Sequence, residues 1–267
     1  MGRLPADGHV HAEFSWDAPH GSVERTCRRA VELGMPGLVF TEHADFVQVH
    51  EGQHRLELVP YVEEIERCRA LFPGLRILLG VELAEPHWFA AEARELVSGA
   101  PIERVLGSVH CMGGRESPRD ASQSMPVAVS PVDDLRAHLR ETLALVESEA
   151  EFDLLAHLDY PKRYWPRAAE PLDESVLEEE YRSVLRAAAR RGSVLEVNTT
   201  RGMDPARGLC PGPLPLRWWR EEGGEAVVLG SDAHSPEALA LGFETGRQAA
   251  EAAGFRPGRD PLDYWRR

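Results

Sequence analysis

Two histidines separated by one residue lie in the stretch GHVHAEFSWD at residues 8–17. Alternate residues of a β-strand point to the same face, so at a strand end His9 and His11 would point the same way, with Cα atoms about 6–7 Å apart. That arrangement suits a metal ion better than a hydrophobic core, because neutral imidazole is a common metal ligand. Two alternating histidines are a short pattern, however, and the rest of the chain has to decide.

Six further short apolar segments also end in, or carry, residues that can bind a metal. These residues are Glu42 and His43, Glu82, His110, His157 and Asp159, Glu196 and Asn198, and Asp232 and His234. In a parallel barrel the carboxyl ends of the strands converge on one face, where the active site forms. Each residue taken singly could be a hydrogen-bonded loop residue or an ion-pair partner. Seven strands that each deliver such a residue to one rim favour a metal centre.

The strand-end residues are imidazoles and carboxylates without a cluster of thiolates, a set that suits Zn, Mn or Fe. Roughly eight ligands are too many for one tetrahedral ion, which predicts two or three divalent metal ions bridged by a carboxylate. Such a centre lowers the pKa of a bridging water and neutralises phosphoryl oxygens. Hydrolysis of a phosphate ester is therefore the expected chemistry.

The elements that must position these residues alternate along the chain. Strand-like segments lie at residues 4–11, 36–43, 76–83, 103–110, 152–159, 193–200 and 225–232, and helical patterns lie at about 22–33, 60–72, 86–98, 131–149, 173–191 and 236–253. Alternating strands and helices imply an α/β fold with a parallel sheet and helices outside. Seven such units without a dinucleotide-binding glycine fingerprint suggest a closed or nearly closed barrel.

Local signals mark several helix ends. Ser130-Pro131 and Ser235-Pro236 each read as an N-cap residue followed by a proline at the first helical position. Asp173 can cap the helix that Gly192 ends. The apolar stripe between these two residues predicts a helix face packed on the core.

The chain has 267 residues, enough for one large domain or two small ones. No linker rich in Pro, Gly or Ser divides it, so we expect a single domain over residues 1–267. The one long irregular stretch is 111–130. A loop of that length is either a mobile lid or plain surface.

The formal net charge of −14 argues against a nucleic-acid-binding surface, which needs clustered cations. No apolar run approaches the roughly 18 residues that a membrane span requires, and the N-terminus has no apolar segment typical of a secretory signal. The four cysteines are scattered, without a CxxC pair, which fits a reducing compartment. We therefore expect a cytoplasmic protein, whose oligomeric state the sequence does not indicate.

Six stretches resemble, in order, the motifs of the polymerase-and-histidinol-phosphatase (PHP) superfamily, and specifically of its histidinol-phosphate phosphatases. They are HVHAEFSWD, FTEHADF, GVE, GSVH, AHLD and GSDAH, and they span the chain from His9 to His234. The resemblance implies a distorted, TIM-like (β/α)7 barrel with a trinuclear metal centre. It also implies hydrolysis of L-histidinol phosphate to L-histidinol and phosphate, a step of histidine biosynthesis, by a metal-bridging hydroxide.

Carried over residue by residue, the resemblance implies three metal sites. The first would comprise His9, His11, Glu82 and Asp232; Glu82 would bridge to a second with His110 and His157; Asp17, His43 and His234 would form the third. Glu82, Asp232 and His234 are the expected catalytic members of this set. Asp17 replaces a histidine of the relatives, and it could instead be an ordinary turn residue or helix cap.

Three basic residues follow strand ends and are the expected phosphate-binding residues. Lys162, the only lysine among 30 basic residues, and Arg163 follow AHLDYP, and Arg201 follows EVNTT. Arginine suits phosphate because its planar fork donates two hydrogen bonds, although each residue could also be a solvated surface charge. By the resemblance, basic residues near these strand ends bind the phosphate.

The cationic end of histidinol phosphate needs a carboxylate or a backbone acceptor. Glu13, Asp45 and Glu196 are candidates among which the sequence does not choose. Glu42 is expected to orient its neighbour His43 rather than to bind metal.

Three alternatives stay open at this point. A related phosphoesterase could act on a nucleotide or another small phosphate ester. An amidohydrolase barrel also begins with HxH, but it typically has eight strands and often a bridging lysine on the fourth, where this chain has His110. A non-catalytic, metal-stabilised binding scaffold is disfavoured because none of the expected ligand positions is apolar.

Overall fold

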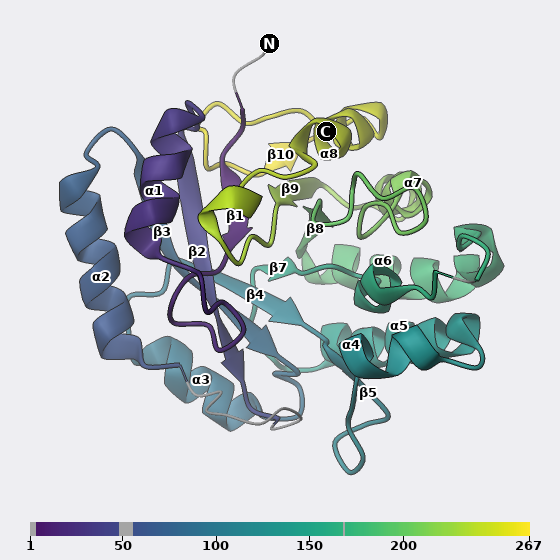
Figure 1. Cartoon of the computed structure of the whole chain (residues 1–267). Helices are drawn as coiled ribbons and strands as arrows, with labels where there is room; N and C mark the ends of the chain where they lie inside the picture. Colours follow the sequence, from purple (N-terminus) through teal and green to yellow (C-terminus); the bar gives the residue numbers. More distant parts are fainter. Residues whose placement is uncertain (1–3, 48–55, 168) are drawn as a thin grey trace.

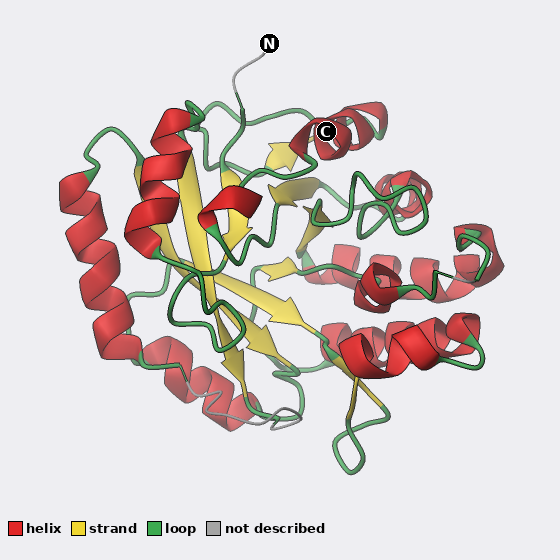
Figure 2. Ribbon diagram, in the orientation of Figure 1, coloured by secondary structure: helices red, strands yellow, loops and turns green. Residues whose placement is uncertain are grey.

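Eight strands form one sheet in the order β1-β2-β3-β4-β7-β8-β9-β10 (Figures 1 and 2). The computed structural model describes residues 4–47, 56–167 and 169–267. The strands are β1 (Asp7–Val10), β2 (Gly37–Asp45), β3 (Arg76–Ala84), β4 (Arg104–Ser108), β7 (Leu154–Leu155), β8 (Val194–Asn198), β9 (Ala226–Gly230) and β10 (Trp265–Arg266). The first seven pair in parallel and are the seven predicted strands, whereas β10 pairs antiparallel with β9.

The sheet curls until β1 lies beside β9, the last of the parallel strands, at their carboxyl ends. There the His11 N–H donates to the Ala233 carbonyl at 2.8 Å, and the Asp232 N–H donates to the His9 carbonyl at 2.8 Å. The buried carboxylate of Asp7 accepts the Ser231 N–H at 2.9 Å beside them. The closure brings the last strand end next to the first, and the predicted distorted barrel is confirmed.

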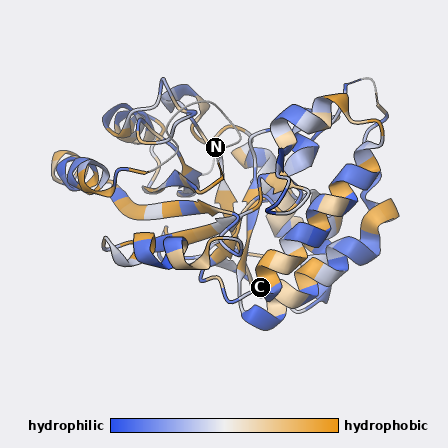
Figure 3. Cartoon of the chain, turned by 90° about the horizontal axis from the view of Figure 1, so that it is seen from below, coloured by the Kyte–Doolittle hydropathy of each residue, from blue (hydrophilic) through white to orange (hydrophobic). Residues whose placement is uncertain are grey.

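Helices cover the outside of the curled sheet (Figure 2). The longer ones are α1 (Val23–Glu32), α2 (Leu58–Leu71), α3 (Ala90–Ser98), α5 (Pro131–Glu147), α6 (Glu178–Arg191), α7 (Pro213–Glu221) and α8 (Phe243–Ala252). Apolar residues dominate the strands, while the helices alternate apolar and polar faces (Figure 3). Helix α6 follows this pattern, because Tyr181, Val184 and Leu185 are fully buried on one side and Gly192 ends it with a φ of 78°.

Several boundaries differ from the sequence-based expectations. Helix α7 was not predicted, because Pro213 and Pro215 obscure its pattern; both lie in the first turn, where proline is tolerated. The segment predicted as one helix over 236–253 consists of the 3-10 turn η4 (Pro236–Ala238) and α8, separated by Gly242 with a φ of 75°. Ser130 precedes Pro131 at the start of α5, but its hydroxyl contacts the Asp133 carboxylate and caps no N–H.

The irregular stretch 111–130 contains short elements of its own. Strands β5 (Cys111–Met112) and β6 (Arg119–Asp120) form a hairpin, which α4 (Ala121–Ser124) and the 3-10 turn η1 (Met125–Val127) follow. Two more 3-10 turns, η2 (Tyr160–Tyr164) and η3 (Glu174–Leu177), lie in the loop between β7 and α6. Asp173 caps η3 by accepting the Ser175 N–H.

Within the described residues, no helix combines the length and the apolar composition that crossing a membrane requires.

Candidate metal centre

All nine residues predicted to bind metal meet at the carboxyl ends of the parallel strands. They are His9, His11, Asp17, His43, Glu82, His110, His157, Asp232 and His234. His9, His43 and Glu82 lie within strands, and the others lie in the loops just after strand ends. Strand pairing sets their depth, since His43 of β2 lies in register with Glu82 of β3.

Glu82 is the centre of the cluster, and its two carboxylate oxygens face different histidines. Oε2 lies 3.3 Å from His9 Nε2 and 3.4 Å from His11 Nε2. Oε1 lies 2.7 Å from His157 Nε2 and 3.3 Å from His110 Nε2. A carboxylate placed this way can join two ions, one on each oxygen.

The remaining residues extend the cluster on one side. His43 Nδ1 lies 3.2 Å from Glu82 Oε2, and its Nε2 lies 3.5 Å from Asp17 Oδ1. His234 Nε2 lies 3.1 Å from Asp17 Oδ2, and its Nδ1 lies 3.5 Å from Asp232 Oδ1. Asp17 therefore lies between two histidines as a ligand would, rather than as a helix cap.

Three groups of ligand atoms lie within 4.8 Å of one another in the described part of the chain. They are His11, His43 and His234; His9, His11 and Glu82; and His43, Glu82 and His110. These groups share His11, His43 and Glu82, so they cut across the three sets that the resemblance implies. The donor atoms form one continuous cluster in which neighbouring sites share ligands.

The hydrogen-bond partners of His9 determine which of its ring nitrogens carries a proton. His9 Nδ1 lies 2.7 Å from Glu196 Oε1, and a carboxylate at that distance requires an N–H on Nδ1. The Nε2 of the same ring faces Glu82 and can bind a cation shared with that carboxylate. Burial lowers the pKa of His9, but Glu196, Asp232 and Glu82 outweigh it and hold that pKa above its ordinary value. Gly230 makes room for the contact between His9 and Glu196, because a Cβ there would come within 2.2 Å of Glu196 Oε1.

A chain of hydrogen bonds orients His11 in a similar way. The Ser15 hydroxyl donates to Glu42 Oε2 at 2.5 Å, so its oxygen accepts from His11 Nδ1 at 3.0 Å. His11 Nε2 then faces His9 Nε2, only 2.9 Å away. Two ring nitrogens and a carboxylate that converge in this way fit a shared cation, so the donor set fits a metal centre.

The sequence suggested that Glu42 orients His43, but its carboxylate does not contact the His43 ring directly. Its carboxylate accepts the Ala12 N–H at 2.8 Å and the Ser15 hydroxyl, and Ser15 in turn accepts the His43 N–H at 3.0 Å. Glu42 thus acts through Ser15, mainly on His11. Strand alternation explains the difference, because neighbouring residues of a strand point to opposite faces.

The burial of these charges shifts their pKa values strongly. Burial alone would raise the pKa of Glu82, but His9 and His110 outweigh it and hold that pKa well below its ordinary range. Burial likewise opposes the charge on Asp232, whose pKa Arg163 and His9 hold well below the usual value. Burial, with His43 and His234 beside it, lowers the pKa of His11 to about 4, so His11 stays neutral near pH 7.

Backbone strain is concentrated at this end of the barrel. Among the described residues three non-glycine residues have positive φ angles: Glu85 at 46°, Asp232 at 53° and Ala240 at 59°. The left-handed conformation costs energy for residues with a Cβ, and it persists where surrounding contacts impose it. Two of the three strained residues line the site, which supports a functional role for the region.

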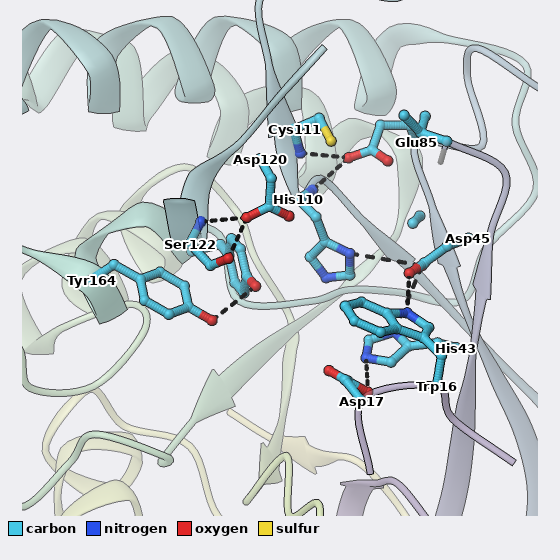
Figure 4. A pocket seen from close by; sticks show the side chains of 13 residues that line it. Trp16, Asp17, His43, Asp45, Glu85, His110, Cys111, Asp120, Ser122 and Tyr164 are labelled. Atoms are coloured by element: carbon cyan, nitrogen blue, oxygen red, sulfur yellow. Dashed lines mark hydrogen bonds and ion pairs between the residues drawn. The ribbon is translucent and has the colours of Figure 1, made fainter. Parts of the chain in front are cut away.

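Two hollows adjoin the cluster and share Asp17, His43, His110, Tyr160 and Tyr164 in their linings. The inner hollow is completed by Glu82, Arg163, Asp232 and His234. The acidic hollow, shown in Figure 4, is completed by Trp16, Asp45, Val47, Ala84, Glu85, Cys111, Asp120 and Ser122. Among the described lining residues, Arg163 is therefore the one cation of the inner hollow, and the acidic hollow adds the carboxylates of Asp45, Glu85 and Asp120.

The carboxylates of the acidic hollow are fixed by hydrogen bonds (Figure 4). Glu85 Oε1 accepts the backbone N–H groups of His110 at 2.5 Å and Cys111 at 2.8 Å. Burial raises the pKa of Glu85 to about 7. Asp45 Oδ2 accepts the indole N–H of Trp16 at 2.7 Å.

Sequence reasoning missed Glu85, Asp120 and Ser122 as site residues. Asp120 and Ser122 lie in the stretch predicted only as irregular loop, where the Asp120 carboxylate accepts the Ser122 N–H at 2.7 Å. The one sequence signal for Glu85 is its position three residues after Glu82. The strained turn that directs it into the hollow cannot be predicted from the sequence.

The three predicted phosphate-binding residues have different surroundings. Arg163 is buried in the inner hollow, where its Nη1 contacts Asp232 Oδ2 and its Nε has no hydrogen-bond partner within the described part of the chain. Lys162 points away from both hollows and pairs with Asp159 and Glu174, which corrects its assignment. Arg201 is exposed and lines neither hollow, so its role stays a prediction.

The three residues predicted to bind the cationic end of the substrate lie in different surroundings. Glu13 accepts the Val23 N–H at 2.6 Å at the start of α1, away from the hollows. Glu196 is fully buried against His9 and the His157 N–H. Only Asp45 lines the acidic hollow.

The chain is similar to known proteins over most of its length. The family described as PHP domain matches residues 7–200. A protein of Lactococcus lactis named histidinol-phosphatase is 28% identical, covering 85% of this chain and 83% of the relative. Proteins named probable histidinol-phosphatase are 31% identical in Deinococcus radiodurans, covering 86% of both chains, and 32% identical in Thermotoga maritima, covering 87% of this chain and 85% of the relative.

Solved structures share the fold. A crystal structure of histidinol phosphate phosphatase from Lactococcus lactis, complexed with zinc, L-histidinol and phosphate, superimposes with a TM-score of 0.84 at 25% identity, covering 94% of each chain. A structure from Listeria monocytogenes superimposes with a TM-score of 0.78 at 19% identity, covering 90% of this chain and 99% of that one, and supports the fold alone. The predicted TIM-like architecture is consistent with both.

Proposed function

The chain belongs to the PHP domain family, and from that premise we propose that it is a metal-dependent phosphatase that hydrolyses L-histidinol phosphate to L-histidinol and phosphate. The observation that carries the proposal is the cluster centred on Glu82, with a buried arginine on one side and an acidic hollow on the other. The curated relatives named histidinol-phosphatase agree with the enzyme class predicted from the sequence. The family excludes the amidohydrolase alternative.

Two or three divalent ions, with Zn, Mn and Fe as the candidates, fit the donor set. His9, His11 and Asp232 would hold one ion, His110 and His157 a second, with Glu82 between them, and Asp17, His43 and His234 a third. When bound, the ions supply Lewis acidity and a nucleophile derived from water at neutral pH. The zinc in the similar Lactococcus structure supports this assignment.

Arg163 holds the phosphate in this proposal. Its guanidinium is buried beside the cluster, and no described residue hydrogen-bonds its Nε. Burial opposes the charge, but Asp232 raises the pKa of Arg163 well above its ordinary value, so the side chain stays cationic. A fixed cation next to the reacting phosphoryl group stabilises the negative charge that develops on it.

The acidic hollow selects an ester whose alcohol part is cationic. Asp45, Glu85 and Asp120 line it, and it joins the inner hollow at Tyr160 and Tyr164, whose hydroxyls lie 3.0 Å apart. L-Histidinol carries an amine, which suits the carboxylates of a hollow that adjoins the phosphate site. A nucleoside monophosphate would instead place an uncharged sugar and a base against three carboxylates.

We place the protein in the cytoplasm as one domain over residues 1–267, acting on a small phosphate ester without nucleic acid or membrane. The net charge of −14 supports a partner other than nucleic acid. The four cysteines are unpaired, which suits a reducing compartment.

A substrate panel tests the proposal. The protein is loaded separately with Zn, Mn and Fe, and phosphate release is measured from L-histidinol phosphate, nucleoside monophosphates and sugar phosphates. We expect kcat/KM for L-histidinol phosphate to exceed the others by at least about 100-fold, since buried carboxylates left unpaired discriminate strongly. Metal-dependent preference for a nucleotide would replace the substrate but keep the centre. Bound metal without turnover would favour the scaffold alternative.

A further inference from the structure

The turn η2 directs its side chains to two opposite sides. Tyr160, Arg163 and Tyr164 line the inner hollow, and the Arg163 guanidinium lies 5.3 Å from the centre of the Tyr160 ring. Lys162, the only lysine of the chain, points the other way and is 3% exposed. A buried lysine directly next to the arginine expected to hold phosphate calls for a physical explanation.

Lys162 is held by two carboxylates from different segments. Its Nζ lies 2.8 Å from Asp159 Oδ2 and 2.7 Å from Glu174 Oε1. Asp159, which precedes the turn, also accepts the Tyr181 hydroxyl at 2.8 Å. We name these four residues, Lys162, Asp159, Glu174 and Tyr181, the lysine anchor.

The lysine anchor connects the turn to elements far along the chain. Glu174 lies in η3 and Tyr181 in α6, which packs beside α5 in Figure 1. Gly212 at the start of α7 leaves space for the Glu174 carboxylate, because a Cβ there would come within 2.3 Å of Glu174 Oε1. The backbone of η2 is a single short 3-10 turn, so these contacts rather than its own hydrogen bonds fix its place.

The geometry points to Lys162 as a positioning residue for phosphate binding: its ammonium ties the turn that carries Arg163 to Glu174 and thereby fixes the guanidinium in the inner hollow. The inference rests on the function proposed above, because Arg163 is assigned there to the phosphate. Displacement of a binding group by about 1 Å can cost on the order of 100-fold in catalysis. Loss of Lys162 should therefore weaken phosphate contacts selectively.

Product inhibition of the metal-loaded enzyme separates this role from a general effect on folding. In Lys162→Met we expect the inhibition constant of inorganic phosphate to rise about 10- to 100-fold. That of L-histidinol should rise clearly less, because the three carboxylates of the acidic hollow lie outside the turn, although Tyr160 and Tyr164 of the turn line both hollows. The matched control is Val184→Ala, which opens a gap on the buried face of α6 without removing an ion. It should leave both constants within about twofold at a temperature where it is folded.

Removal of one partner from a buried ion pair is strongly destabilising. A second variant keeps the test decisive if Lys162→Met does not fold for this reason. The double variant Lys162→Met/Glu174→Gln removes one positive and one negative charge, so the anchor keeps its net charge. It should fold and still bind phosphate weakly. Wild-type phosphate inhibition in either folded variant, or equal weakening for phosphate and L-histidinol, would overturn the role.

The uniqueness of Lys162 gives a readout that does not depend on activity. An amine-reactive ester can label only Lys162 and the chain's N-terminal amine, and mass spectrometry separates the two. We expect Lys162 in the native holoenzyme to react about 100-fold more slowly than in denaturant, relative to the terminal amine. Equal rates in the two conditions would show that the anchor does not hold the turn.

Failure of the proposed function gives a different result. If the wild-type enzyme releases no phosphate from L-histidinol phosphate, the substrate is wrong, yet calorimetric titration with inorganic phosphate still tests Lys162. Weaker phosphate binding in Lys162→Met in that experiment supports the positioning role, and unchanged binding overturns it.

Discussion

Two buried groups of charged side chains lie on either side of the turn η2, and they are built in opposite ways. Around Lys162 every charge faces its complement, with one ammonium between two carboxylates and a tyrosine hydroxyl as an additional donor. Around Glu82 the histidine nitrogens converge on one another and on carboxylates, and the protons that could separate them are held on the far side of the rings.

The difference shows how a structural ion network can be told from a binding site. A buried charge is tolerated when its partners satisfy it within the protein. The ammonium of the lysine anchor meets that condition with two carboxylates, although Asp159 Oδ1 has no hydrogen-bond partner among the described residues. The cluster around Glu82 instead gathers histidine nitrogens suited to bind a cation, because Glu196 and Ser15 each contact the outer ring nitrogen of His9 and His11 and leave the inner nitrogens facing one another. The same residue types therefore support different conclusions in the two places.

The largest expected difference between the two groups appears when one carboxylate is removed from each. Glu82→Ala should lose bound metal and reduce kcat by about three orders of magnitude or more, a loss comparable to or larger than that of a key electrostatic group. Glu174→Gln removes a carboxylate from the lysine anchor and should retain its metal. Metal analysis by mass spectrometry alongside phosphate release measures both, and full activity in Glu82→Ala would refute the scheme.

The next effect concerns the groups that orient the ligands. Glu196→Gln places an amide against His9 Nδ1 and the His157 N–H, so one of its two acceptor positions is lost. We expect metal affinity to fall about 10- to 100-fold and activity to recover at high metal concentration. Glu180→Gln is a suitable control, because Glu180 forms a half-buried pair with Arg136 and lines neither hollow. Unchanged metal affinity in Glu196→Gln would mean that the orientation of His9 is not needed.

A smaller effect should appear in the pH dependence of KM. Burial raises the pKa of Glu85 to about 7, so its carboxylate gains charge between pH 6 and pH 8 and attracts a cationic substrate more strongly at the higher pH. Glu85→Gln should raise KM about tenfold at pH 8, as expected for the loss of about 1.5 kcal/mol from a charge-assisted hydrogen bond, and only about twofold at pH 6. A ratio of the two KM values that is independent of pH would remove Glu85 from substrate recognition.

The barrel and its ligand rim could be predicted because both follow from local periodicity. The i, i+2 spacing of His9 and His11 shows a shared strand face, and parallel strands bring their carboxyl ends together. The spacing of residues does not show how deeply a strand-end side chain lies in the site. Glu196 looked equivalent to the other strand-end carboxylates, yet it lies behind His9 and orients it.

Contacts between distant segments account for the remaining errors. Lys162 looked like a phosphate ligand because it follows a strand end, whereas its partner Glu174 belongs to a turn twelve residues later. Helix α7 was missed because two prolines in its first turn masked the apolar pattern of Leu216, Trp218 and Trp219. Neither relation appears in the spacing of residues along the chain.

The smallest expected effect is on stability and comes from the loss of a single tyrosine hydroxyl. A matched pair of buried tyrosines compares a charged with a neutral acceptor. Tyr181 donates to Asp159 in the lysine anchor, and Tyr61, equally buried, donates to the carbonyls of Phe40 and Gly80. A hydrogen bond to a charged group contributes about 1.5–3 kcal/mol and a neutral one about 0.5–1.5 kcal/mol. Tyr181→Phe should therefore lower the free energy of unfolding more than Tyr61→Phe, as denaturant titration would measure. Equal losses would mean that Lys162 alone satisfies Asp159 and that the anchor is a simple ion pair.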